Sequence, residues 1–79
     1  MYNLRAAISK NGITVYYNVE TDDAERKALF KELGANAGRP EALSQPGHFR
    51  THFGWSNGLT RDSGIIILKR LHVGFEETR

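Results

Sequence analysis

The residues that could do chemistry gather in the second half of the chain. Residues 48–72 hold four basic side chains, one acidic side chain, Asp62, and all three histidines. Residues 1–47 carry equal numbers of basic and acidic side chains, so the net charge of +2 hides a local asymmetry. Arginine and histidine bind phosphates and carboxylates, and histidine also transfers protons near neutral pH. The sequence therefore predicts a binding or catalytic site in residues 48–72.

The run at residues 48–55 predicts a strand with two different faces. Its aromatic residues recur at every second position, which is the period of a strand that packs on a core with one side only. We expect the core side to consist of Phe49, Thr51, Phe53 and Trp55. We expect the opposite side to carry His48, Arg50 and His52.

The apolar run at residues 64–73 predicts a partner strand, joined to residues 48–55 by a turn at Asn57-Gly58. Apolar residues occur at both odd and even positions of this run, so both faces of the strand would be apolar, which indicates a central strand of the sheet. The matching patterns predict a hairpin in which Trp55 faces Ile65 and Phe53 faces Ile67.

This register would place Arg50 opposite Arg70 and His48 opposite His72, on the side away from the core. Like charges in direct opposition disfavour a strand pair by up to about 1 kcal/mol, so the arrangement favours a bound anion between them. Tyr16 would lie nearby if the two hairpins of the chain are adjacent. The predicted partner- or anion-binding surface therefore consists of Tyr16, His48, Arg50, His52, Ile66, Leu68, Arg70 and His72.

Residues 2–20 predict another hairpin. Two alternating runs flank Asn11-Gly12, a dipeptide that readily forms a type I′ turn, and this turn pairs Ile8 with Val15. The core side would consist of Tyr2, Leu4, Ala6, Ile8, Val15, Tyr17 and Val19. The solvent side would consist of Arg5, Ala7, Ser9, Thr14, Tyr16 and Asn18.

A helix is expected after this hairpin. Thr21 or Asp22 can cap it, acidic residues suit its first turn, and Gly34 can end it. The apolar stripe of this helix is formed by Leu29, Phe30 and Leu33. Residues 34–47, rich in Gly, Ala, Asn and Pro, are interpreted as a connector with at most one short helical turn after Pro40.

The order of these elements predicts an α+β fold. A four-stranded antiparallel sheet, built from two hairpins, would carry one helix on its apolar face, as a single domain over residues 1–79. An alternative interprets residues 28–43 as a helix-turn-helix with the last hairpin as its wing. Gly38 and Pro40 would then stand at the start of the recognition helix, which argues against this alternative.

The composition narrows the class of protein. The absence of cysteine excludes a disulfide framework, a thiol nucleophile and a cysteine-based zinc site. No signal peptide or membrane-spanning run is seen, so we expect a cytoplasmic protein without membrane contact. A chain of this size buries only about 60% of its surface on folding, which favours a homo-oligomer or an obligate partner.

The histidine spacing argues against a metal site. His48 and His52 lie about 13 Å apart along a strand that rises roughly 3.3 Å per residue, so they cannot chelate one ion together. No glycine-rich phosphate loop or nucleophile motif is found, and we expect no cofactor and assign no catalytic residue.

These patterns predict a small non-enzymatic binding module. Its His/Arg face would bind an acidic protein surface or, as a second choice, nucleic acid. The layout is typical of inhibitors or adaptors encoded by phages or mobile elements, although a fold does not imply a function. One alternative is a metal-independent ribonuclease-type toxin that uses the same face. Another is a structural homo-oligomer that buries Ile66 and Leu68.

Overall fold

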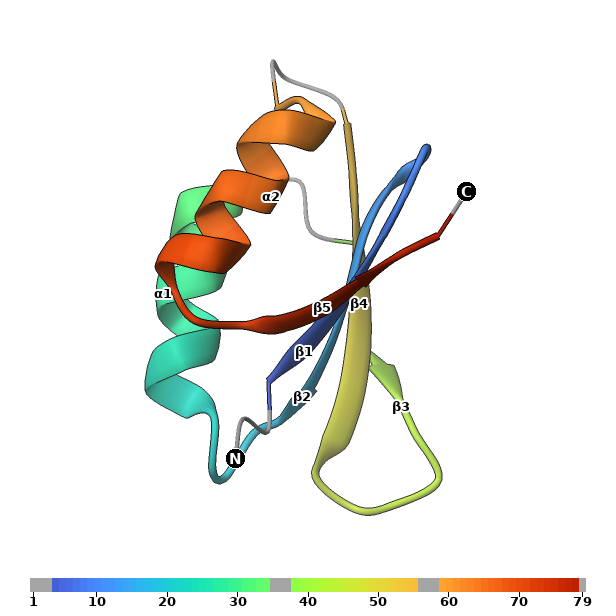
Figure 1. Ribbon diagram of the computed structural model, residues 1–79. Helices are drawn as coiled ribbons and strands as arrows, with labels where there is room; N and C mark the ends of the chain where they lie inside the picture. The colour runs from blue at the N-terminus through green and yellow to red at the C-terminus, as the bar shows by residue number, and fades with distance from the viewer. Residues whose placement is uncertain (1–3, 35–37, 56–58, 79) are drawn as a thin grey trace.

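The computed structural model describes residues 4–34, 38–55 and 59–78. It is an α+β fold in which a mixed five-stranded sheet carries two helices on one of its faces (Figure 1). The strands follow the order β3-β4-β2-β1-β5 and comprise β1 (Arg5–Ser9), β2 (Gly12–Asn18), β3 (Glu41–Ala42), β4 (His48–Gly54) and β5 (Gly74–Glu77). The helices are α1 (Asp23–Leu33) and α2 (Arg61–Arg70). The predicted fold class is confirmed, but the sheet has one more strand and the fold one more helix than expected.

Strands β1 and β2 form the first predicted hairpin in a different register. Ile8 lies opposite Ile13 and not Val15, so the turn residues are Lys10 and Asn11. A shift by two residues leaves each side chain on its predicted side, because side chains alternate with a period of two.

The predicted core side of this hairpin is buried, with two qualifications. The residues buried there are Leu4, Ala6, Ile8, Ile13, Val15 and Tyr17. Val19, which was expected to join them, is 38% exposed because β2 ends at Asn18. Tyr2 lies outside the described residues.

Helix α1 confirms the expected helix. Leu29 and Leu33 are buried, and Gly34 ends the helix at a φ of 88°. Asp22 occupies the N-cap position, but its side chain does not cap the helix; the carboxylate accepts a hydrogen bond from the N–H of Asn18 at 2.9 Å. This bond holds the turn between β2 and α1.

Residues 61–70 form helix α2, so the prediction of a second hairpin strand there is wrong. The Thr60 hydroxyl accepts a hydrogen bond from the N–H of Ser63 at 3.1 Å, which caps the first turn. Gly64 and Leu68, one helical turn apart, are buried. A Cβ at Gly64 would lie 2.8 Å from Ile13 Cδ1, so glycine lets α2 approach the sheet closely.

Strand β4 therefore pairs with β2 and not with residues 64–73. Phe53 lies opposite Ile13, which replaces its predicted partner Ile67, and the predicted pairing of Trp55 with Ile65 is also absent. The predicted turn at Asn57-Gly58 lies outside the described residues.

Both edges of the sheet differ from the expectation. β5 runs parallel to β1, so the sheet is mixed and not antiparallel throughout as predicted. At the other edge, Pro40 is followed by the short strand β3 and not by a helical turn. The strand at Glu41–Ala42 also excludes the helix-turn-helix alternative.

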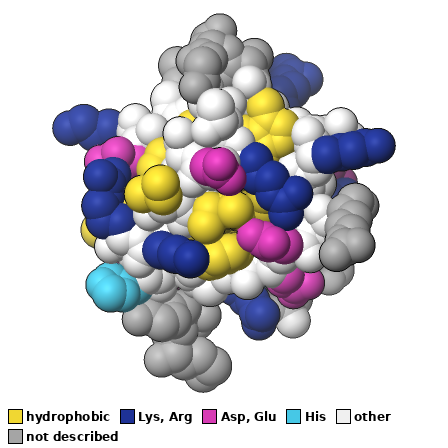
Figure 2. Space-filling view, turned by 45° about the horizontal axis from the view of Figure 1, so that its top comes forward, with side chains coloured by type: hydrophobic (Ala, Val, Ile, Leu, Met, Phe, Trp, Pro, Cys, Tyr) yellow, Lys and Arg dark blue, Asp and Glu magenta, His cyan; other side chains and the backbone are white. Residues whose placement is uncertain are grey.

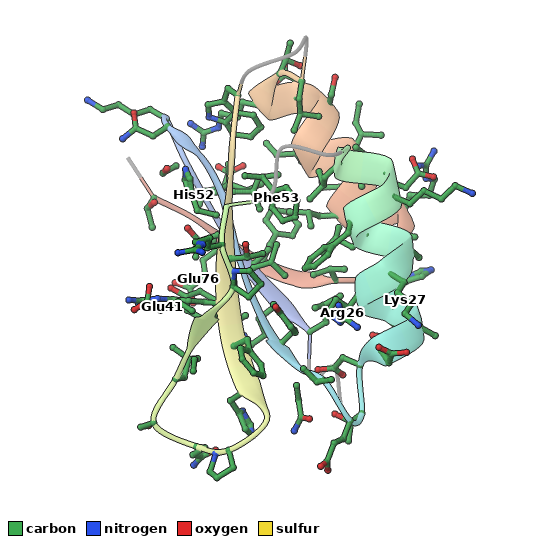
Figure 3. All side chains as sticks on the ribbon, turned by 180° about the vertical axis from the view of Figure 1, so that it is seen from behind. Arg26, Lys27, Glu41, His52, Phe53 and Glu76 are labelled. Atoms are coloured by element: carbon green, nitrogen blue, oxygen red, sulfur yellow. The ribbon has the colours of Figure 1, made fainter. Side chains whose placement is uncertain are left out.

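The core lies between the sheet and the two helices. Phe53 is 1% exposed and packs edge-on against Phe30 of α1, with ring centroids 5.1 Å apart. In Figure 3, Phe53 points toward the helices and His52, the preceding residue, points the other way. In the described parts of the chain, no helix has the length and apolarity needed to cross a membrane.

Candidate functional site

The described structure leaves one face of the sheet without a helix, and we call it the open face (Figures 1 and 3). It collects side chains from all five strands and from the segment before β3. These side chains belong to Arg5, Ala7, Thr14, Tyr16, Asn18, Arg39, Glu41, His48, Arg50, His52 and Glu76.

The alternation of β4 orients three of these side chains. Phe49 packs against the core and Phe53 is buried in it, so the residues between them must face the other way. His48, Arg50 and His52 lie on the open face, as the sequence predicted.

A row of side chains crosses the open face at its centre. Tyr16 of β2 lies directly opposite Arg50 of β4 on one side and Arg5 of β1 on the other. Glu41 of β3 lies opposite Arg50 and extends the row to the edge of the sheet. Tyr16 thus lies beside Arg50, although the second hairpin, on which that expectation depended, does not form.

Arg50 and Glu41 form a two-point ion pair. The Arg50 guanidinium donates through Nη2 to Glu41 Oε1 at 2.6 Å and through Nε to Oε2 at 3.1 Å. These hydrogen bonds and the attraction of the charges lower the pKa of the Glu41 carboxyl below its ordinary value. The same contacts raise the pKa of Arg50.

A hollow of about 340 Å³ opens beside this pair. It is lined by Thr14, Tyr16, Gly38, Arg39, Glu41, Arg50, Thr51 and His52. Its lining includes two arginines and a histidine but one carboxylate, that of Glu41. The hollow therefore favours an anionic group as its occupant.

Gly38 places Arg39 at the rim of this hollow. Its N–H donates to the carbonyl of His52 at 2.6 Å, and its own carbonyl accepts from the hydroxyl of Thr51 at 2.7 Å. A Cβ on Gly38 would lie 2.9 Å from the His52 carbonyl oxygen, so a side chain there would push the segment off β4. Arg39 takes part in none of the ion pairs found among the described residues.

The remaining polar side chains of the open face have partners within it. Nδ1 of His52 lies 3.1 Å from the hydroxyl of Thr14, and Nε2 of His48 lies 3.3 Å from the side-chain amide of Asn18. At the β5 side, Arg5 lies 3.9 Å from Glu76. The open face thus carries acidic as well as basic groups.

Four predicted site residues do not reach the open face, because they belong to α2 or its C-terminal turn. Arg70 forms an ion pair with Glu32 of α1 at 2.5 Å, on the helical layer. His72 follows α2 in a turn, and the residue opposite His48 is Asn18 of β2. Leu68 is buried in the core, and Ile66 of the same helix is 62% exposed.

His48 and His72, which the predicted register placed opposite one another, therefore belong to different layers of the described fold. His48 lies on a strand of the sheet, and His72 lies at the end of the helical layer. The predicted juxtaposition of Arg50 with Arg70 is also absent. Among the described residues, no cluster of three or more His, Asp or Glu side chains could hold a metal ion.

Sequence reasoning missed several residues of the open face, among them the charged residues Arg5, Arg39, Glu41 and Glu76. Arg39 and Glu41 belong to the segment that was interpreted as a connector, and Arg5 was treated as ordinary solvent-facing sheet. The available signal was Gly38 and Pro40 on either side of Arg39, since glycine permits a close approach of two backbones and proline fixes its own φ.

Comparisons of the chain with protein-family models, with curated proteins and with solved structures give no significant match. The function has to be argued from the geometry of the open face itself.

Proposed function

We propose that the chain is a non-enzymatic binding module whose open face binds an acidic segment of a partner protein. The observation that carries this proposal is the hollow beside Tyr16, whose lining includes Arg39, Arg50 and His52 but a single carboxylate, that of Glu41. A carboxylate that enters the hollow would meet Arg39, which has no ion pair within the described structure.

Tyr16 supplies the apolar contact that such a site needs. It lies at the centre of the open face and is 37% exposed, between two arginines on the neighbouring strands. Tyrosine and arginine are enriched among the residues that contribute most to protein–protein binding. A rigid sheet holds both side chains in place, which reduces the entropy lost on binding.

The charges of the open face favour a protein over nucleic acid. Its described arginines are Arg5, Arg39 and Arg50, and two of them already pair with Glu76 and Glu41. Nucleic-acid affinity comes mainly from several cations that neutralise phosphates, and this face offers one that has no ion pair. Figure 2 is not a view onto the open face; on the side that it shows, basic and acidic side chains are interspersed.

The test is a titration of the ¹⁵N-labelled protein at low salt, followed by NMR. The probe is a short poly-glutamate peptide, and a uridine oligonucleotide is titrated separately. We expect the peptide to shift amide signals of β2, of β4 and of the segment at Gly38. Arg39→Ala should weaken the peptide affinity roughly tenfold, because it removes a charge-assisted contact.

Lys31→Ala is the matched control, since it removes one exposed cation from α1 on the other layer. It should change the peptide affinity by less than about twofold. The proposal is wrong if the peptide leaves the open-face signals unchanged, or if both variants weaken binding equally. Tight binding of the oligonucleotide without binding of the peptide would replace the protein partner with nucleic acid.

A further inference from the structure

The arrangement of Glu41 bears on how the open face recognises its ligand. Arg50 is the central cation of the hollow, and Glu41 holds it through both carboxylate oxygens. Two-point pairing is also the geometry in which arginine binds a carboxylate of another molecule. In the described structure the binding groups of Arg50 are thus used by a side chain of the same protein.

The strand that carries Glu41 is the shortest one of the described sheet. β3 has two residues, both exposed, and pairs with β4 on one side only. The side chain of Glu41 itself is 62% exposed. It can leave Arg50 by rotation of its own side chain, while the pairing of β3 with β4 stays in place.

Arg39 can pair with the Glu41 carboxylate once Glu41 has left Arg50. It lines the same hollow as Glu41 and stands two residues before it in the chain. When a second carboxylate enters, two carboxylates and two guanidinium groups share the hollow. The charges of these four groups balance, so the exchange leaves no unpaired anion.

Resting on the proposed function, we infer that Glu41 is an internal occupant of the site and that an aspartate or glutamate side chain of the partner displaces it from Arg50. The open face then binds a single carboxylate of the partner at Arg50, with Tyr16 packed beside it. Glu41 lowers the affinity for every acidic ligand that uses Arg50, because each ligand must first break the internal pair.

The first experiment compares the affinity of the poly-glutamate peptide for three proteins: the unchanged chain, Glu41→Gln and Glu32→Gln. Glu41→Gln keeps the size of the side chain and removes the competing charge, so we expect binding about five- to tenfold tighter. Glu32→Gln removes the same charge from an exposed ion pair with Arg70 on the helical layer. This matched control should change the affinity by less than about twofold at moderate salt, because exposed charges are screened over about 10 Å.

The second experiment follows the ¹³C signal of the Glu41 carboxyl through a pH titration. Arg50 faces this carboxyl directly, and Arg39, His52 and Tyr16 line the same hollow. In the free protein we expect the pKa to lie below the ordinary value for glutamate. With saturating peptide we expect it to move upward, because Arg50 then pairs with the peptide.

The outcomes separate this inference from the proposed function. If the peptide binds the open face but Glu41→Gln does not tighten binding, the inference is overturned and the proposed function stands. An unchanged Glu41 titration in the presence of bound peptide has the same meaning. If the peptide binds none of the three proteins, both proposals are overturned.

Discussion

The two faces of β4 are built from alternate residues of one strand, and their contributions to the protein differ. On the covered side, Phe53 is almost fully buried against Phe30, and burial of such a side chain stabilises a protein by about 1.5–3 kcal/mol. On the open side, Arg50 and His52 contact other polar groups at the surface, where ion pairs contribute little. The covered face therefore holds the fold together, and the open face is free to carry a site.

Truncation on the covered side of β4 should have the largest effect. Phe53→Ala is expected to lower the free energy of unfolding by about 3–5 kcal/mol, because it leaves a cavity among the core residues. Urea denaturation followed by circular dichroism measures this change. If that variant does not fold, Phe53→Leu gives a smaller loss that can be measured.

His52→Ala is the control for this comparison, because the residue is adjacent in the chain and on the opposite face. It should change the free energy of unfolding by less than about 0.5 kcal/mol. A loss as large as that of Phe53→Ala would show that the open face also stabilises the fold, which would break the comparison.

A substitution in α2 tests how closely the helix covers the sheet. Gly64→Ala places a methyl group 2.8 Å from Ile13 Cδ1 and 3.1 Å from a ring carbon of Trp55. Overpacking costs about 1–3 kcal/mol, and the higher helix propensity of alanine offsets up to about 1 kcal/mol of it. We therefore expect a net loss of about 1–2 kcal/mol in thermal or urea unfolding. Ile66→Ala, at an exposed position of α2, should change stability far less, and a stabilising Gly64→Ala would contradict the close contact.

The start of α2 should show a smaller effect. Thr60→Ala removes the hydroxyl that caps the first turn and is expected to cost about 1 kcal/mol of unfolding free energy. Thr60→Ser keeps the capping oxygen and should retain most of the stability. Equal losses in the two variants would mean that the hydroxyl does not contribute as a cap.

The smallest effect on stability is expected on the open face, where the readout is a titration. In the free protein the Glu41 carboxyl titrates below the ordinary glutamate value of about 4.3, because Arg50 donates hydrogen bonds to the charged form. The pKa of Glu41 is lower in the folded than in the unfolded protein. The ion pair therefore adds to the free energy of unfolding at pH values above the unfolded pKa, and this stabilisation is lost as the pH falls through the folded pKa. Arg50→Ala should raise the Glu41 pKa toward 4.3 in ¹³C NMR. An unchanged midpoint would show that the pair is absent in solution.

Much of the open face could be read from the sequence because strand alternation is a local property. The aromatic residues of β4 had to be buried, which placed His48, Arg50 and His52 on the other side whatever the neighbouring strand was. In the first hairpin the predicted register was wrong by two residues, but each side chain still lies on its predicted side because side chains alternate with a period of two.

Other members of the site could not be read in this way. β3 is two residues long, and a pattern of period two cannot be recognised over so short a run. The position of Arg39 depends on hydrogen bonds between Gly38 and β4, which join parts of the chain that are distant in sequence. Its place in the hollow therefore follows from tertiary contacts.

The error at residues 64–73 has a similar origin. Three consecutive isoleucines favour a strand, but Thr60, Asp62 and the terminal pair Lys69–Arg70 are helix signals. Propensities differ by only a few tenths of a kcal/mol per residue, so they cannot decide between these signals. Packing decides here, because the helix buries Gly64 and Leu68 against the sheet and leaves Ile66 exposed, whereas a strand would place all three on one face.

The helix after the first hairpin and the two faces of β4 follow from the sequence, because each shows its own period within one short segment, and the order of such segments gives the class of the fold. Tertiary structure decided that β5 pairs with β1, that α2 covers the sheet, and that Glu41 meets Arg50. These outcomes depend on which surfaces of separate segments fit together, and the free energy of burial over many residues outweighs the weak local preferences of each one.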